Sequence, residues 1–116
     1  MTRYIVLYHA PLAVAQRFAQ ATPEEAQLGL QAWTDWAEKL GPALVDPGKP
    51  LGQSHRVTAN GIILGDTDII GLSIIQAASM DGALDLVRDH HHLAWSEDCT
   101  ITLLEEIGIP EVAGGS

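Results

Sequence analysis

The stretch from Ile69 to Trp95 constrains the fold more than any other part of the chain. It begins with IIGLSIIQA, an apolar run without proline or charge that predicts a strand. The segment SMDGALDLVRD follows, with Ser79 placed to cap a helix and Asp81 in its first turn. Three consecutive histidines and HLAW complete the stretch. The pattern predicts a strand, a short helix, and a titratable cluster where the helix leads into a last strand.

Alternation along the two best strand candidates predicts apolar side chains on both faces of a sheet. In the strand 69–77, Gly71, Ser73, Ile75 and Ala77 form one face, and Ile70, Leu72, Ile74 and Gln76 form the other. In the strand 3–9, Tyr4, Val6 and Tyr8 alternate with Ile5, Leu7 and His9. Helices can cover only one face of such a sheet, and water on the other would meet a large apolar patch. We therefore expect a homodimer, packed sheet against sheet.

Start and stop signals place the other elements. A short helix is expected over 14–20, and Thr22, Pro23 and Glu25 open a longer one that Gly41 and Pro42 end. The residues 43–52, ALVDPGKPLG, are predicted to be a loop because they are rich in Pro and Gly. A strand over 55–59, a tight turn at 60–61 and a return strand over 62–64 follow. The last strand is expected over 98–107.

This order predicts an α+β fold of the ferredoxin-like type, βαββαβ with an antiparallel sheet and both main helices on one face. The 116 residues suit one domain, expected over 1–110, with a flexible tail over 111–116.

Charge and cysteine content narrow the class of protein. The net charge of −9 repels phosphate backbones and anionic lipid, so neither nucleic acid nor a membrane is an expected partner. A lone cysteine, Cys99, cannot form an internal disulfide and is expected to be a small core residue. Without a signal-peptide pattern or a membrane-length apolar run, the chain is predicted to be cytoplasmic.

Histidines, one aspartate and scarce aromatic residues are the candidates for a functional site. A carboxylate near a histidine can tune it for general acid–base work, which makes His9, Asp46 and His90 the candidate catalytic residues, expected at one rim of the sheet. Four side chains are the candidate substrate-binding residues of a pocket for a small apolar or aromatic molecule: Tyr8, Trp33, Trp36 and His92. Core packing is the other interpretation of the two tryptophans on the long helix.

The spacing of the histidines and the absence of known motifs give no support to metal or cofactor chemistry. Neighbouring histidines point in different directions, so the run 90–92 is not predicted to bind a metal. No GxSxG, GxxxxGKS or GxGxxG motif occurs, and no cofactor is expected. Two functions stay open: a lyase or isomerase using His/Asp general acid–base chemistry, and a noncatalytic dimer that binds a metabolite or a protein.

Several stretches together resemble the YCII-related family in its longer branch. They are YIVLYHA, ATPEEAQLGLQAWTDWAEKLG, ALVDPGKPLG, IIGLSIIQAASMDGALDLVRDHHHL and ITLLEEI. The resemblance implies a dimeric α+β barrel with a cleft between sheet and helices or between subunits. Two departures limit what it implies about chemistry. The helix over 22–41 lacks the histidine of the family's His/Asp pair, and His90-His91-His92 stands where the branch has His-Pro-His.

Overall fold

The computed structural model describes residues 1–108 as an α+β fold built around a four-stranded antiparallel sheet. The predicted tail over 111–116 lies outside the described residues. The elements in chain order are β1 (Thr2–His9), α1 (Leu12–Ala19), α2 (Pro23–Leu40), a 3-10 turn η1 (Gly41–Ala43), β2 (Leu44–Pro50), β3 (His55–Thr58), β4 (Gly61–Leu64), β5 (Ile69–Ala77), α3 (Met80–Val87), α4 (His92–Trp95) and β6 (Thr100–Glu105).

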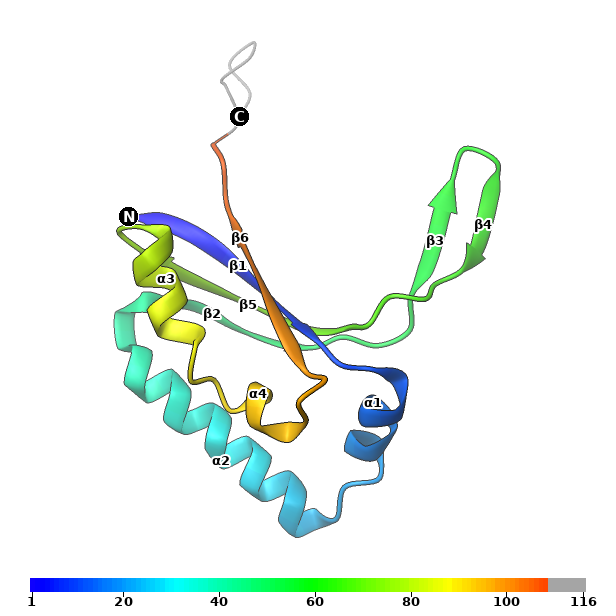
Figure 1. The fold of residues 1–116 in the computed structure, drawn as a ribbon, viewed down its shortest axis with the longest axis horizontal. Coiled ribbons are helices and arrows are strands. Elements are labelled where there is room, and N and C mark those ends of the chain that lie inside the picture. Colours follow the sequence, from blue (N-terminus) through cyan, green and yellow to red (C-terminus); the bar gives the residue numbers. More distant parts are fainter. Residues whose placement is uncertain (109–116) are drawn as a thin grey trace.

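The main sheet has the strand order β2-β5-β1-β6, and every neighbouring pair is antiparallel. The helix α2 connects β1 to β2 and α3 connects β5 to β6, and Figure 1 shows both on the same side of the strands. This arrangement is compatible with a ferredoxin-like fold.

The long helix α2 begins where the sequence predicts it. The Thr22 hydroxyl accepts a hydrogen bond from the Glu25 amide at 3.2 Å, and the Glu25 carboxylate accepts one from the Thr22 amide at 3.3 Å. This capping box satisfies two amides that a helix start leaves without partners. The predicted cap at Ser79 is also present, since its hydroxyl accepts from the Gly82 amide.

The segment predicted as a loop over 43–52 is instead the edge strand β2. Prolines are tolerated there because an edge strand leaves one row of amides unpaired. The pairing with β5 shifts register twice, between Leu44 and Asp46 and again before Lys49. At Gly48, with φ of 78°, the strand runs so close to β5 that an added β-carbon would lie 1.5 Å from the Leu72 carbonyl oxygen. Glycine is therefore required at this position.

The segment predicted as the second strand of the main sheet lies outside that sheet. Strands β3 and β4 pair only with each other among the described residues, as a two-stranded hairpin with its turn at the predicted Asn60-Gly61. Figure 1 shows the hairpin extending away from the other elements. The register places Val57, Ile62 and Leu64 on one face, and each is at least 69% exposed. An isolated two-stranded hairpin with an exposed apolar face is only marginally stable in water.

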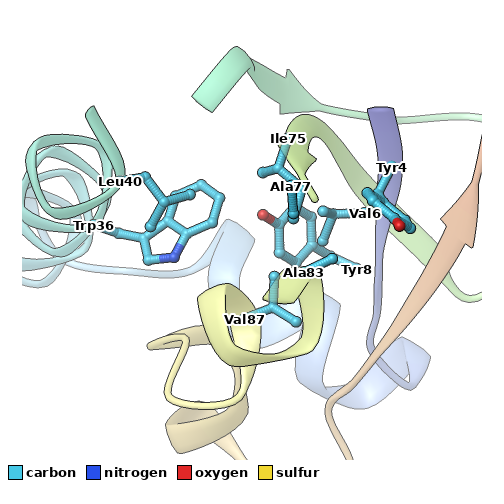
Figure 2. Packing of buried hydrophobic residues seen from close by; sticks show 9 residues of the cluster. All are labelled: Tyr4, Val6, Tyr8, Trp36, Leu40, Ile75, Ala77, Ala83 and Val87. Atoms are coloured by element: carbon cyan, nitrogen blue, oxygen red, sulfur yellow. The ribbon is translucent and has the colours of Figure 1, made fainter. Parts of the chain in front are cut away.

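The core lies between the sheet and the helices α2 and α3 (Figure 2). The small face of β5 points inward, as does the aromatic face of β1, and nine buried residues form the main cluster: Tyr4, Val6, Tyr8, Trp36, Leu40, Ile75, Ala77, Ala83 and Val87. Cys99 is buried beside Ala10 and Val14 in a second cluster, which confirms it as a core residue.

The other side of the sheet carries aliphatic side chains that the helices do not cover. We call this surface the open sheet face; it comprises Ile5, Leu7, Leu72, Ile74 and Leu104. Four of these side chains are partly buried by their neighbours within the sheet, and Leu104 is 47% exposed. The strand β6 is shorter than the predicted 98–107 at both ends, and a turn in which the Cys99 amide donates to the Ser96 carbonyl lies directly before it.

Candidate functional site

A cavity of about 660 Å³ lies between α1, α2, β2, β5 and the segment 91–95. Its volume is within the range of small-molecule pockets. The walls are mostly aromatic and aliphatic, with Tyr8, Leu30, Trp33, Leu51, Ile70 and Trp95 as the large contributors. The residues with charged or imidazole side chains in the wall are Lys49, His91 and His92.

Small residues and one irregularity in the sheet create this space. Ala15 and Ala19 are the side chains that α1 presents to the cavity, and Gly71 leaves room beside the Tyr8 ring. The register shifts between Tyr8 and His9, which pair with Gly71 and Ile69, so Ile70 is the extra residue of a β-bulge. Strict alternation would place Ile70 on the open sheet face. The bulge turns it toward both buried clusters and into the cavity wall.

A chain of hydrogen bonds, which we call the buried relay, runs behind the cavity wall. The Tyr8 hydroxyl donates to Ser73 Oγ at 2.9 Å, and Ser73 Oγ donates to the Pro47 carbonyl at 2.7 Å. The His92 amide donates to His90 Nδ1 at 3.0 Å, so that nitrogen is an acceptor and the proton of the neutral ring is on Nε2. His90 Nε2 therefore donates to the Tyr8 hydroxyl across 3.2 Å. Every donor in the relay meets one acceptor.

Burial fixes the protonation of the relay. Desolvation, aided by the neighbouring His91 and His92, lowers the pKa of His90 to about 3. Desolvation raises the pKa of Tyr8 to about 12, against the opposing effect of its hydrogen bond to Ser73. Near neutral pH His90 stays neutral and Tyr8 stays protonated. Neither group is therefore suited to exchange a proton with a ligand. We interpret the relay as a structural element that holds β1, β2, β5 and the 90–92 segment together.

His91 is the polar side chain of the cavity wall that lacks a hydrogen-bond partner at one ring nitrogen. Its Nε2 is buried and has no such partner within residues 1–108. The ring stacks on His90 at 4.1 Å between centroids and meets the edge of Trp33 at 4.8 Å. Desolvation lowers its pKa, so the imidazole is neutral near pH 7. A buried polar atom without a partner is costly, which makes this nitrogen a candidate contact for a ligand.

His92 is held by the backbone. Its Nε2 donates to the His9 carbonyl at 2.9 Å, because a carbonyl oxygen can only accept. Desolvation lowers the pKa of this imidazole as well. Its ring also contacts the edge of Tyr8 with 5.3 Å between centroids.

The three predicted catalytic residues do not converge, which corrects the expectation of a shared rim. The His9 side chain lies on the side of β1 opposite to Tyr8 and bonds to Asp68 and Thr102. Asp46 is exposed and accepts a hydrogen bond from the Gly48 amide at 2.8 Å, the geometry of a local turn. His90 is buried in the relay.

Of the predicted substrate-binding residues, the cavity wall contains Tyr8, Trp33 and His92. Trp36 does not line it, which is a second correction. Its ring is buried in the core between α2 and α3, and its Nε1 donates to the Leu86 carbonyl at 3.1 Å. One turn of helix therefore separates a pocket residue from a core residue. The two indole rings meet edge to face at 5.8 Å.

Sequence reasoning missed His91, Lys49 and Trp95 in the cavity wall, and Asp68 and Thr102 beside His9. Trp95 was visible as a scarce aromatic in HLAW, and Asp68 as a carboxylate directly before a strand. Nothing local distinguished Lys49 or Thr102.

The fold and the site define an α+β protein with a helix-covered antiparallel sheet and a mostly apolar cavity. No protein-family model matches the chain, and no curated protein matches it. Within residues 1–108, no three His, Cys, Asp or Glu side chains are grouped so as to hold a metal ion. None of the helices in that same range is long and apolar enough to cross a bilayer.

Proposed function

We propose that this protein binds a small, mostly apolar molecule in the cavity between α1, α2 and the sheet. The cavity itself is the observation that carries the proposal: about 660 Å³, walled by two tryptophans, a tyrosine and aliphatic side chains. Flat aromatic walls favour a ligand with a ring, since edge and face contacts add to the burial of apolar area.

A polar end of the ligand is expected to face His91 or Lys49, the residues of the cavity wall best able to bind it. The Lys49 ammonium favours a carboxylate or phenolate there. The neutral His91 ring can donate one hydrogen bond to the ligand or accept one from it. Together these features support an aromatic or aliphatic acid as the ligand class.

Binding without turnover is the function that the cavity supports better. The general acid–base interpretation needs a titratable group that can gain or lose a proton near neutral pH. The pKa of about 3 for His90 and of about 12 for Tyr8 make both members of the buried relay unsuited to that role.

Binding can be tested with 1-anilinonaphthalene-8-sulfonate, an aromatic anion that fluoresces in apolar sites. We expect saturable binding that Ala19→Phe weakens by roughly tenfold, because the ring occupies cavity volume. Ala13→Phe is the matched control, since Ala13 is an exposed position of α1 that does not line the cavity. Absence of binding, or equal weakening by both variants, would contradict the proposal.

We further propose that the chain works as a cytoplasmic homodimer through the open sheet face, related to YCII proteins. Two apolar surfaces support a second copy as the partner: the open sheet face, and the hairpin face of Val57, Ile62 and Leu64. Sedimentation should give a dimer at micromolar concentration, and Leu72→Lys should give a monomer. Leu84→Lys, at an exposed position on α3, should leave the dimer intact. A monomeric wild-type chain would refute this part of the proposal.

A further inference from the structure

Three side chains on the side of the sheet away from the cavity form a hydrogen-bonded array of carboxylate, imidazole and hydroxyl. Asp68 Oδ1 lies 2.7 Å from His9 Nδ1, and His9 Nε2 lies 2.8 Å from Thr102 Oγ1. They come from the loop before β5, the end of β1 and the middle of β6. The Ala10 amide donates to the Asp68 carbonyl at 2.9 Å, which fixes the loop beside His9.

The hydrogen bonds assign the protons of the array when the His9 ring carries a single proton. Asp68 stays ionised, since the hydrogen bond from His9 lowers its pKa. A carboxylate only accepts, so His9 Nδ1 carries the ring proton and Nε2 is an acceptor. The Thr102 hydroxyl then donates to Nε2. This is the tautomer opposite to that of His90, whose Nδ1 accepts. It is the arrangement in which an imidazole can take a proton from a hydroxyl group.

The three side chains of the array differ in their exposure to solvent. Thr102 is exposed and the Asp68 side chain is 60% exposed, whereas only 18% of the His9 side chain is. In a single copy of the chain a substrate can therefore reach the hydroxyl while the ring is held between its two partners. Thr102 pairs with Leu7 and lies on the same face, so a second copy on the open sheet face would cover the hydroxyl. The acyl transfer is therefore expected of the monomer, and Leu72→Lys should not lower it.

Backbone pairing places an amide near the hydroxyl. The Glu106 amide bonds to the Arg3 carbonyl across the β1–β6 ladder. Bonded pairs alternate in antiparallel strands, so the register directs the Leu103 amide toward the free edge of β6. An amide next to the nucleophile is the kind of donor that stabilises an oxyanion.

We propose that Thr102 is a nucleophilic hydroxyl that accepts acyl groups from small esters, with His9 as its general base and Asp68 as the positioning residue. Thr102 Oγ1 bonds to the ester carbonyl carbon and gives its proton to His9 Nε2. The bond from that carbon to the alcohol oxygen breaks, and Nε2 returns the proton to the leaving oxygen. Water then attacks the threonine ester and gives a proton to Nε2. The bond between the acyl carbon and Thr102 Oγ1 breaks, Nε2 returns the proton to Oγ1, and the carboxylic acid leaves.

This activity is separate from ligand binding in the cavity, because His9 and Tyr8 point to opposite sides of β1. Each proposal can fail without the other. Ala19→Phe, which fills the cavity, should leave the acyl transfer unchanged.

The test uses p-nitrophenyl acetate as the probe and the full chain as the enzyme. We expect nitrophenol release together with one acetyl group on Thr102, located by peptide mass spectrometry. Thr102→Val should abolish the acetylation and Thr102→Ser should keep it. Thr100→Val is the matched control, because Thr100 is another exposed threonine of β6 and should leave the rate unchanged.

Variants of the other two residues separate chemistry from structure. His9→Asn should lower the rate by roughly a hundredfold, and His55→Asn, at an exposed histidine of the hairpin, should not change it. Asp68→Asn should lower the rate by roughly tenfold or more and change its pH profile, while Asp66→Asn in the same loop should do neither. Acetylation confined to lysines or other histidines, or a rate that Thr102→Val leaves unchanged, would overturn the proposal.

Discussion

Removing the Tyr8 hydroxyl by Tyr8→Phe tests whether the buried relay stabilises the fold. The change leaves the ring in the core but takes away the acceptor of His90 Nε2 and the donor to Ser73 Oγ. Two hydrogen bonds are lost at about 1 kcal/mol each, and the buried His90 N–H without an acceptor adds about 1 kcal/mol or more. We expect a loss of about 2–4 kcal/mol in the free energy of unfolding, a large share of the stability of a small domain.

Urea unfolding followed by circular dichroism, at one fixed protein concentration, measures this loss. Tyr4→Phe is the matched control, since Tyr4 is equally buried in the same strand but makes no hydrogen bond through its hydroxyl within residues 1–108. It should cost less than about 0.5 kcal/mol. Combining Tyr8→Phe with Ser73→Ala should cost about 1 kcal/mol less than the sum of the two single changes, because they remove one shared bond. A cost for Tyr8→Phe equal to that of Tyr4→Phe would show that the relay contributes nothing.

Three more predictions follow from burial and backbone geometry. Acid should destabilise the fold, because an unfolded histidine titrates near about 6.5 whereas His90 titrates at about 3. The unfolded chain then binds more protons between these values, so stability is full above about pH 6.5 and falls below it, by about 2 kcal/mol between about pH 7 and pH 5 in urea unfolding. A flat profile would contradict the burial of His90. Gly48→Ala should cost about 2–5 kcal/mol in the same assay, since its β-carbon would overlap the backbone of β5 at positive φ, whereas Gly52→Ala, which meets no atom, should cost little. Trp36→Ala should lower the free energy of unfolding by about 3–5 kcal/mol and Trp33→Ala by clearly less. Only Trp33→Ala should weaken binding of the fluorescent anion. The reverse result would make Trp33 the core residue and Trp36 the cavity residue.

Elements with a strong local signal were predictable from the sequence. The strand 69–77 has the predicted bounds because alternation without proline leaves few alternatives. The start of α2 was predicted because Thr22 and Glu25 satisfy the helix amides within four residues.

Elements that depend on distant partners were not predictable. The strand β2 contains Pro47, Gly48 and Pro50, which indicate a turn when read locally. It is a strand only because β5 offers it an edge, and two register shifts accommodate the prolines. The hairpin turn at 60–61 was predicted from the sequence, but its residues do not indicate that the hairpin lies outside the main sheet.

The candidate site shows the same division. A cluster of histidines after the second main helix and an aromatic wall were predicted, and His92, Trp33 and Tyr8 do line the cavity. The roles of Tyr8 and His90 in the buried relay were not predictable, because Tyr8 bonds to Ser73 and His90, which lie 65 and 82 positions away in the sequence. His9 was singled out for its chemistry, yet its partners Asp68 and Thr102 emerge only from the pairing of β1 with β5 and β6.

The bulge at Ile70 divides β5 into residues that border the cavity and residues that lie on the open sheet face. Beyond it, Leu72 and Ile74 face away from the helices, while Ile70 and Gly71 border the cavity. Drift at the first pair alters the surface that would meet a neighbour, and drift at the second reshapes the chamber. If the proposed ligand and dimer exist, changes at Ile70 and Gly71 would alter ligand preference without touching the surface of Leu72 and Ile74.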